Sequence, residues 1–348
     1  MTTTLYQIGT FAAGNRLLAP EQRAVQSSTE RGNAITSGHR ACRGCGEALA
    51  ARVVLDAASR ASSGRMVTVN ATGCLEVFST PYPESAWQVP WLHSLFGNAA
   101  AVASGVSAAL RATGRDDIRV VAQAGDGGTV DIGMGCLSGM FERNDDVLFV
   151  CYDNQGYMNT GVQRSGATPP AASTATTRPV GTSVGNAFGT GKSLPLIAMA
   201  HEIPYVATAT VADLHDLEAK VVTAMSMHGA RYIHVLVPCP LGWGSASAET
   251  IRVARLAVQS GLFPVFEARE GAVTAAMTIR AQVPVEDYLR PQTRFDHLFR
   301  GDGRPDVVAA LQERADRNIA RFGLLAEQPD NPPDGRPQDP APLEKETP

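Results

Sequence analysis

The chain has 348 residues with a formal net charge of −4 and a pI near 6.0, and 44% of its residues are hydrophobic. This length and apolar content are enough for the core of one large α/β domain or of two small ones. The weak negative charge gives no electrostatic reason to expect nucleic acid or an anionic membrane as a partner, and no run of about 18 apolar residues is present that could span a bilayer.

Residues 1–36 are polar with little periodicity, and we predict an arm that precedes a domain at residues 37–300. The arm has no positive charge before its weakly apolar stretch, so we expect a cytoplasmic protein without a secretory signal. In that compartment the six cysteines are expected to be thiols or metal ligands rather than disulfides.

Two of these cysteines, Cys42 and Cys45, form a CxxC motif with glycines around it. The apolar residues after the motif recur at helical spacing, so the cysteines are predicted to lie on the loop that enters a helix. Backbone N–H groups and the helix dipole would favour thiolates there. Residues 66–70 are predicted to be a strand, and the turn after this strand leads to Cys74.

The middle of the chain alternates between strand and helix patterns. Residues 80–93 hold three prolines and two tryptophans, and we expect a loop packed over a pocket or against a partner. The alternation favours a doubly wound parallel sheet whose ligands lie at the carboxyl ends of the strands. The predicted elements here are a helix of small residues at 96–110, a strand at 119–124, a helix near 130–143 and a strand at 147–152.

A long segment at residues 168–192 is rich in Pro, Ala, Ser, Thr and Gly and has no period, which is typical of a functional or mobile loop. Further on, a strand at residues 232–237 leads directly into Cys239, which lies between two prolines. A C-terminal helix is expected at 301–326, followed by a Pro-rich, polar tail at 327–348 that should be disordered. The other predicted elements are a strand at 205–210, a helix at 212–228, a helix from about 250 to 261 and a weaker strand at 263–268.

Polar residues follow two of the predicted strands at the same edge of the sheet. Asp126 ends the strand at 119–124 and Asn154 ends the strand at 147–152, and 154 − 126 = 28 residues leave room for one crossover helix between parallel strands. A carboxylate, an amide carbonyl and a backbone carbonyl near Gly156 suit a hard cation such as Mg²⁺. Glycines at the start of the helix would let backbone N–H groups approach an anion. The alternative is two ordinary βα turns.

The cysteines divide into two groups. Cys136 is predicted to lie inside a helix and Cys151 inside a buried strand, where both would be apolar core side chains. The other four fall on loops and are candidate metal ligands. From the residues alone, an iron–sulfur cluster and a zinc site are equally acceptable, whereas a redox pair would need only two of the four. The candidates are Cys42, Cys45, Cys74 and Cys239.

An Asp after glycine with an Asn 28 residues further on is the thiamine diphosphate motif, and the segment DNQGYMNTGVQRSGATP at residues 153–169 closely resembles the corresponding loop of the pyruvate:ferredoxin oxidoreductase family. The resemblance extends over roughly residues 38–299 and includes the four loop cysteines. It implies the doubly wound α/β fold of the thiamine diphosphate-binding type. Gln155 departs from the Glu that the resemblance leads us to expect in this loop.

The resemblance also implies a set of cofactors and of residues that hold them. The cofactors are thiamine diphosphate, Mg²⁺ and a 4Fe-4S cluster bound by the four loop cysteines. Asn159 matches the active-site asparagine, although on sequence alone a loop Asn is usually a turn residue. Glu76 could line the cofactor site or be a surface carboxylate. The implied Mg²⁺ ligands are Asp126, Asn154 and the Gly156 carbonyl, and the further cofactor-binding candidates are Gly125, Gly127, Gly128, Tyr157, Thr160 and Cys74.

The function implied by the resemblance is that of the β subunit of a CoA-dependent 2-oxoacid:ferredoxin-type oxidoreductase. This enzyme would oxidatively decarboxylate a 2-oxoacid, with pyruvate expected, to acyl-CoA and CO₂ and pass electrons to the cluster and then to ferredoxin or another acceptor. An α subunit would supply the glutamate that activates the aminopyrimidine, and γ and ferredoxin-like δ subunits are expected. The alternatives are an aryl 2-oxoacid such as phenylglyoxylate, giving benzoyl-CoA, a zinc-stabilised non-catalytic interaction subunit, or a non-oxidative decarboxylase, which has no use for four loop cysteines.

Overall fold

The structure is a computed structural model, and it describes residues 33–36, 38–81 and 85–325. The predicted tail at residues 327–348 lies outside the described residues, and so do residues 1–32 of the predicted arm. Within the described part of the arm, Ile35 is buried and pairs with Trp87 in an antiparallel bridge. No helix within the described ranges is long and apolar enough to cross a membrane.

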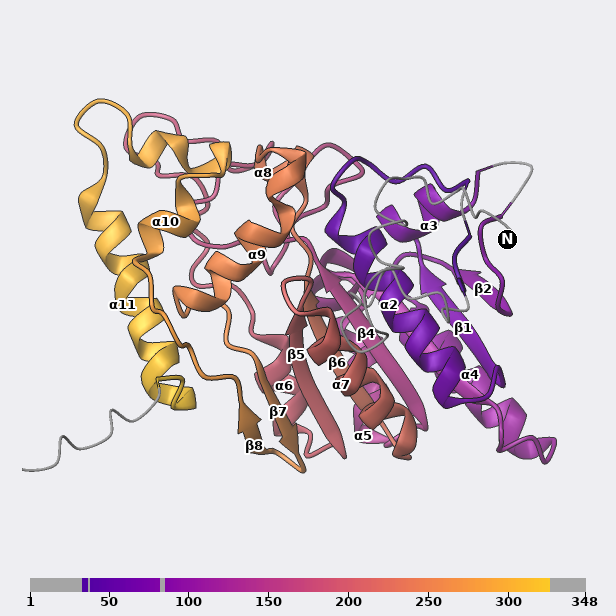
Figure 1. The fold of residues 1–348 in the computed structure, drawn as a ribbon. Coiled ribbons are helices and arrows are strands. Elements are labelled where there is room, and N and C mark those ends of the chain that lie inside the picture. The colour runs from indigo at the N-terminus through magenta and orange to yellow at the C-terminus, as the bar shows by residue number, and fades with distance from the viewer. Residues whose placement is uncertain (1–32, 37, 82–84, 326–348) are drawn as a thin grey trace, which may run out of the picture.

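One eight-stranded sheet forms the centre of the molecule (Figure 1). Its strand order is β2-β1-β3-β4-β6-β5-β7-β8; strands β1 to β6 pair in parallel, and β7 and β8 are antiparallel at one edge. This arrangement confirms the predicted doubly wound α/β fold. The strands are β1 (Met66–Ala71), β2 (Trp91–Ser94), β3 (Arg119–Gly125), β4 (Val147–Asp153), β5 (Tyr205–Thr210), β6 (Arg231–Leu236), β7 (Phe266–Arg269) and β8 (Ala272–Ala276).

Helices cover both faces of the sheet, so its central strands are buried on both sides. Successive side chains of a strand point to opposite faces, and β4 accordingly contributes Leu148 and Val150 to one core and Val147 and Phe149 to the other. The first core lies under α2 and α7, which pack against each other in the foreground of Figure 1. The covering helices are α2 (Gly46–Ala61) and α7 (Leu214–Ser226) on this face and α4 (Ala99–Ala112), α5 (Met134–Glu142) and α6 (Leu194–Ala200) on the other.

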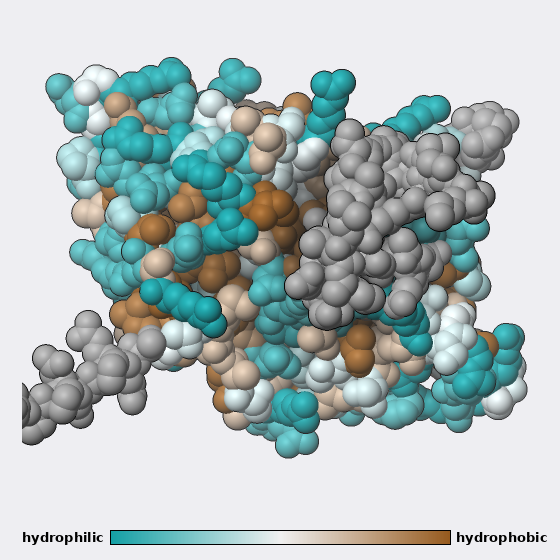
Figure 2. All heavy atoms as spheres, in the orientation of Figure 1, coloured by the Kyte–Doolittle hydropathy of each residue, from teal (hydrophilic) through white to brown (hydrophobic). Residues whose placement is uncertain are grey.

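A third apolar cluster surrounds the buried Trp243 and is covered by the C-terminal helices. Within the range 301–326, where a C-terminal helix is expected, the structure has α11; it begins at Pro305, whose fixed φ suits the first turn, and ends before Gly323, which is left-handed at φ 59°. In Figure 2, hydrophilic side chains cover most of the visible face and hydrophobic ones gather near its middle, over α9. The helices of this region are α8 (Pro240–Trp243), α9 (Thr250–Gln259), α10 (Val285–Leu289) and α11 (Pro305–Phe322).

The structure corrects two predicted elements and adds a strand that the sequence does not predict. Residues 80–93, expected to be a loop, contain the edge strand β2, in which Trp91 stacks on Trp87 with ring centroids 5.4 Å apart. A proline directly before this strand is tolerated because the strand lies at the edge of the sheet. The helix expected near 130–143 begins as a π-helical turn at Gly127–Asp131 before α5. Strand β8 has no sequence signal, because its mostly exposed AVTAA run does not alternate.

A cluster of charged residues joins the amino ends of three strands. Asp146, directly before β4, accepts hydrogen bonds from Arg231 at the start of β6 and from Arg119 at the start of β3, and it pairs with His228. The side chain of Arg231 is 0% exposed. Burial raises the pKa of Asp146, but Arg231, His228 and Arg119 outweigh it and leave the pKa below its ordinary value. Ionised Asp146 therefore stabilises the fold at neutral pH, and this contribution is lost as the pH falls through the folded-state pKa.

We expect Asp146→Asn to lower the free energy of unfolding by about 3 kcal/mol, because it leaves the buried guanidinium of Arg231 without its anion. Chemical denaturation of the purified chain at neutral pH measures this change. Asp145→Asn is the matched control, since Asp145 pairs with Arg143, which is 55% exposed, and an exposed pair contributes at most about 1 kcal/mol. Equal effects of the two substitutions would contradict the assignment of the buried cluster.

Candidate active site

A cavity of about 110 Å³ lies where the carboxyl ends of β3 and β4 meet the starts of two helices. Strands β3 and β4 are parallel neighbours with Gly125 opposite Tyr152, so the residues after them leave the sheet side by side. One bordering helix is α3 (Cys74–Ser79) and the other is α2. The predicted site residues that line the cavity are Cys74, Gly125, Asp126, Gly127, Gly128, Asn154, Gly156, Tyr157, Asn159 and Thr160. The lining residues that were not predicted are Glu47, Thr72, Gly73, Phe96 and Met158.

Two buried oxygen atoms in this cavity have no hydrogen-bond partner among the described residues: Oδ1 of Asp126 and Oδ1 of Asn154. The residues are 1% and 6% exposed. The other carboxylate oxygen of Asp126 accepts from the Ser165 hydroxyl. Burial and the nearby Asp153 carboxylate raise the pKa of Asp126 well above its ordinary value. A divalent cation between the two unpartnered oxygens would offset this cost, so the donor set fits Mg²⁺.

The wall beside Asp126 brings backbone close to the cavity. A Cβ at Gly127 would collide with the ring of Tyr157, so only glycine fits there. Tyr157 is held in turn by its hydroxyl, which donates to Asp131 Oδ2 at 3.1 Å, and by Phe96, whose ring centroid is 5.8 Å away. Because the glycines at the start of the π-helical turn have no side chains, an anion in the cavity could contact their backbone N–H groups directly.

Three of the four loop cysteines lie at helix starts. Cys45 is the N-cap of α2 and its sulfur accepts from Ala48 N at 3.4 Å, and Cys239 is the N-cap of α8 and accepts from Gly242 N at 3.3 Å. Cys74 is the first residue of α3. The CxxC loop reaches the Cys239 loop directly, because Gly46 N donates to the Pro238 carbonyl at 3.2 Å. Cys42 is exposed on the same loop.

The environment of these thiols disfavours thiolates as it stands. Burial and the Glu47 carboxylate raise the pKa of Cys45 to about 12, and burial likewise raises the pKa values of Cys74 and Cys239. Neighbouring sulfurs contribute to this rise, since Cys239, Cys45 and Cys42 each raise the pKa of Cys74 further. In the described ranges, no three Cys, His, Asp or Glu side chains already converge tightly enough to hold a metal ion. Four thiolates here would need the positive charge of a bound metal group.

Glu47 is a residue of this site that the sequence does not single out. It lies on the buried side of α2, is 3% exposed and lines the cavity. Its carboxylate accepts hydrogen bonds from Asn154 Nδ2 and from Leu75 N, each at 3.2 Å. Burial raises the pKa of Glu47 to about 7, and the two hydrogen bonds oppose that rise. Its position directly after the Cys45-Gly46 pair is the only signal in the sequence.

Two other residues that the sequence singles out, Glu76 and Gln155, do not line the small cavity. Glu76 is not among the lining residues; its Oε1 accepts from the Thr80 hydroxyl at 3.3 Å on the other side of α3. Gln155 adopts a left-handed φ of 66°, and its Oε1 accepts from the buried Arg294 at 2.7 Å. The presence of Gln rather than Glu at position 155 therefore affects the contact with Arg294 and not the small cavity. Asn159 and Thr160 are exposed and line that cavity.

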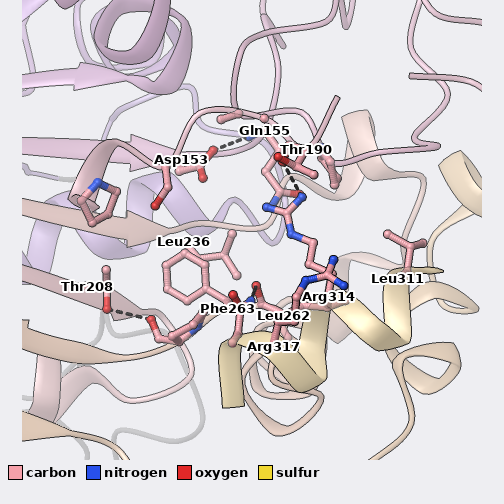
Figure 3. A pocket seen from close by; sticks show the side chains of 18 of the residues that line it. Asp153, Gln155, Thr190, Thr208, Leu236, Leu262, Phe263, Leu311, Arg314 and Arg317 are labelled. Carbon is pink, nitrogen blue, oxygen red and sulfur yellow. Dashed lines mark hydrogen bonds between the residues drawn. The ribbon is translucent and has the colours of Figure 1, made fainter. Parts of the chain in front are cut away.

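A larger cavity, of about 820 Å³, lies on the opposite side of the same loop (Figure 3). Asp153 and Gln155 line it, whereas Asn154 and Gly156 line the smaller cavity, so this loop separates the two cavities. Arg314 and Arg317 of α11 point toward it in Figure 3. The larger of these two cavities is therefore not the one that the predicted cofactor residues line.

Comparison with known proteins identifies the family. Residues 71–235 match the model of the thiamine pyrophosphate enzyme C-terminal TPP binding domain. The chain is 49% identical over 291 residues to pyruvate synthase subunit PorB of Methanosarcina barkeri, covering 83% of this chain and 97% of the relative. The chain belongs to the pyruvate:ferredoxin oxidoreductase family. This confirms the family expected from the sequence and supports thiamine diphosphate as its cofactor.

Other members of the pyruvate:ferredoxin oxidoreductase family differ in substrate. The chain is 40% identical over 300 residues to PorB of Thermotoga maritima, covering 84% of this chain and 92% of the relative. It is 41% identical over 298 residues to ketoisovalerate oxidoreductase subunit VorB of Pyrococcus abyssi, with coverages of 84% and 93%. The solved structure of 2-oxoglutarate:ferredoxin oxidoreductase from Magnetococcus marinus matches with a TM-score of 0.54 at 22% identity, over 81% of this chain and 96% of that chain, which supports the fold.

Proposed function

We propose that this chain is the thiamine diphosphate-binding β subunit of a CoA-dependent 2-oxoacid:ferredoxin-type oxidoreductase that acts on pyruvate. The reaction is the oxidative decarboxylation of the 2-oxoacid to acyl-CoA and CO₂, with electrons passed to ferredoxin or a related acceptor. The observation that carries the proposal is the pair of unpartnered oxygens on Asp126 and Asn154, in a cavity that also includes a loop cysteine. The pyruvate synthase relatives support pyruvate as the substrate.

The chain's own residues would hold the cofactor and orient the substrate. Asp126, Asn154 and the Gly156 carbonyl would bind Mg²⁺, and the backbone at Gly127 and its neighbouring glycine would receive the diphosphate. When bound, thiamine diphosphate supplies the carbon nucleophile for the 2-oxo group, while the protein contributes position and electrostatics. Asn159, exposed at the cavity, would orient the substrate by a hydrogen bond.

We also propose that the four loop cysteines hold a 4Fe-4S cluster that takes electrons one at a time. Support comes from the placement of Cys45, Cys74 and Cys239 at helix starts and from the burial that raises the pKa values of these three thiols, which a bound metal group would reverse. Cys74 belongs both to this group and to the cavity lining. It would therefore connect the thiamine site with the cluster.

The proposed enzyme is a complex of different subunits, as the relatives' own designations as subunits suggest. An α subunit would supply the glutamate that activates the aminopyrimidine, and γ and ferredoxin-like δ subunits would complete electron transfer. The co-purified complex should turn over pyruvate with coenzyme A and a viologen acceptor, whereas the purified chain alone should not. Full 2-oxoacid oxidation by the chain alone would contradict this proposal.

The VorB relative favours a branched 2-oxoacid as the second candidate substrate. A panel of pyruvate, 2-oxoisovalerate, 2-oxoglutarate and phenylglyoxylate, assayed on the same complex, decides between them by kcat/KM. Iron analysis and low-temperature EPR of the purified chain after reduction test the cluster, because zinc gives no signal and the ferredoxin-like δ subunit would add its own iron and signal to the complex. A zinc content with no EPR signal would favour a zinc-stabilised interaction subunit.

A further inference from the structure

Glu47 has no part in the ligand set proposed so far. Its carboxylate is almost fully buried, and within the described ranges both of its hydrogen-bond donors, Leu75 N and Asn154 Nδ2, are uncharged. Burying a carboxylate without a cation is unfavourable. Its presence here therefore points to a role that an uncharged side chain could not fill. Its place on the wall of the small cavity, in contact with a proposed cation ligand, indicates what that is.

The contact between Glu47 and Asn154 fixes the orientation of an amide. A carboxylate accepts hydrogen bonds, so the amide of Asn154 must turn its NH₂ toward Glu47 Oε2, at 3.2 Å. Its oxygen, Oδ1, then faces the opposite way, and it is one of the two buried atoms without a partner. The other is Oδ1 of Asp126 in the same cavity. Glu47 itself cannot turn, because Leu75 N anchors its second oxygen at 3.2 Å.

We propose that Glu47 is a positioning residue that holds the Asn154 amide with its oxygen toward the cation. This inference rests on the proposed function, since it requires a cation between Asn154 and Asp126. Without an acceptor on its other side, the amide could present either its oxygen or its NH₂ to the cavity, and only the oxygen binds a cation.

Glu47→Gln tests this role at constant size. The fixed backbone N–H of Leu75 would take the oxygen of the new amide, so the introduced NH₂ would meet the NH₂ of Asn154. The Asn154 amide would then flip and present NH₂ to the cation. We expect Mg²⁺-dependent affinity for thiamine diphosphate to fall by roughly 10- to 100-fold, as for other groups that orient metal ligands.

The compensating change is Asn154→Asp. Alone, it should also weaken binding, because the introduced carboxylate would face that of Glu47. Combined with Glu47→Gln, it should restore most of the affinity, since the new amide donates to one carboxylate oxygen and leaves the other for the cation. Glu76→Gln is the matched control, because Glu76 is also a partly buried carboxylate but does not line the cavity.

The measurement is calorimetric titration of thiamine diphosphate, with Mg²⁺, into the full complex after its cofactor has been removed by chelation and dialysis. Recovery of Mg²⁺-dependent affinity in the double variant supports the positioning role, since it restores a donor that turns the free oxygen of residue 154 toward the cation. Unchanged affinity in Glu47→Gln, or a double variant that binds no better than Asn154→Asp, would overturn the positioning role of Glu47. The proposed function would still stand if the wild type bound thiamine diphosphate with Mg²⁺. Absence of Mg²⁺-dependent binding in the wild type would overturn both.

Discussion

Replacing Cys239 by serine is expected to reduce viologen reduction by the complex by at least about 100-fold, because even outer partners of metal ligands contribute roughly 10- to 100-fold. Thiamine diphosphate should stay bound. Cys239 does not line the small cavity. Serine is itself a good N-cap, and its hydroxyl could accept the hydrogen bond that Gly242 N now donates to the Cys239 sulfur. Helix α8 would therefore persist, and with it the hydrogen bond from Trp243 Nε1 to the Asn154 carbonyl, at 2.7 Å.

Three measurements on the same preparation check this expectation: dye reduction with pyruvate, EPR of the reduced complex, and thiamine content. Cys136→Ser is the control, because Cys136 is also half-buried but lies on α5 and packs against the core on the other face of the sheet. Its dye reduction should match the wild type. If Cys239→Ser kept normal dye reduction and an unchanged EPR signal, the assignment of Cys239 as a cluster ligand would be wrong.

Asp126→Asn is expected to separate cofactor binding from stability. The variant loses the charge proposed to bind Mg²⁺, so Mg²⁺-dependent affinity for thiamine diphosphate should fall by at least about 100-fold. Without cofactor, the variant should be as stable as the wild type or more stable, by on the order of 1 kcal/mol, because a buried carboxylate near Asp153 is replaced by a neutral amide. The hydrogen bond with Ser165 can persist, since the amide oxygen also accepts.

Thiamine titration and thermal unfolding of the cofactor-free protein give the two quantities. Asp117→Asn, at an exposed carboxylate paired with Arg65, controls for the loss of one negative charge and should change neither. A variant that bound the cofactor normally would remove Asp126 from the cation site. A variant that was strongly destabilised without cofactor would show instead that Asp126 is needed by the fold.

The parts of the site that follow from strand geometry could be predicted from the sequence. Continuous apolar runs such as residues 147–152 predict buried parallel strands. Two such neighbouring strands place Asp126 and Asn154 side by side. Glu47 could not be found, because a Glu on a helix is usually exposed and its burial depends on contacts with Asn154, 107 residues away. The side to which Gln155 points depends on a left-handed backbone that no residue pattern at this position indicates.

The anchoring of the CxxC loop determines when the site can form during synthesis of the chain. Gly46 N donates to the Pro238 carbonyl, and the hydroxyl of Thr250 donates to the Gly44 carbonyl at 2.6 Å, across 206 residues of sequence. More than half of the polypeptide must therefore be synthesised after Cys42 and Cys45 before the loop that carries Cys239 can pack against them. Metal delivered to the nascent chain would meet an incomplete set of the proposed ligands, so we expect the proposed cluster to be loaded only after translation has passed the loop that carries Cys239.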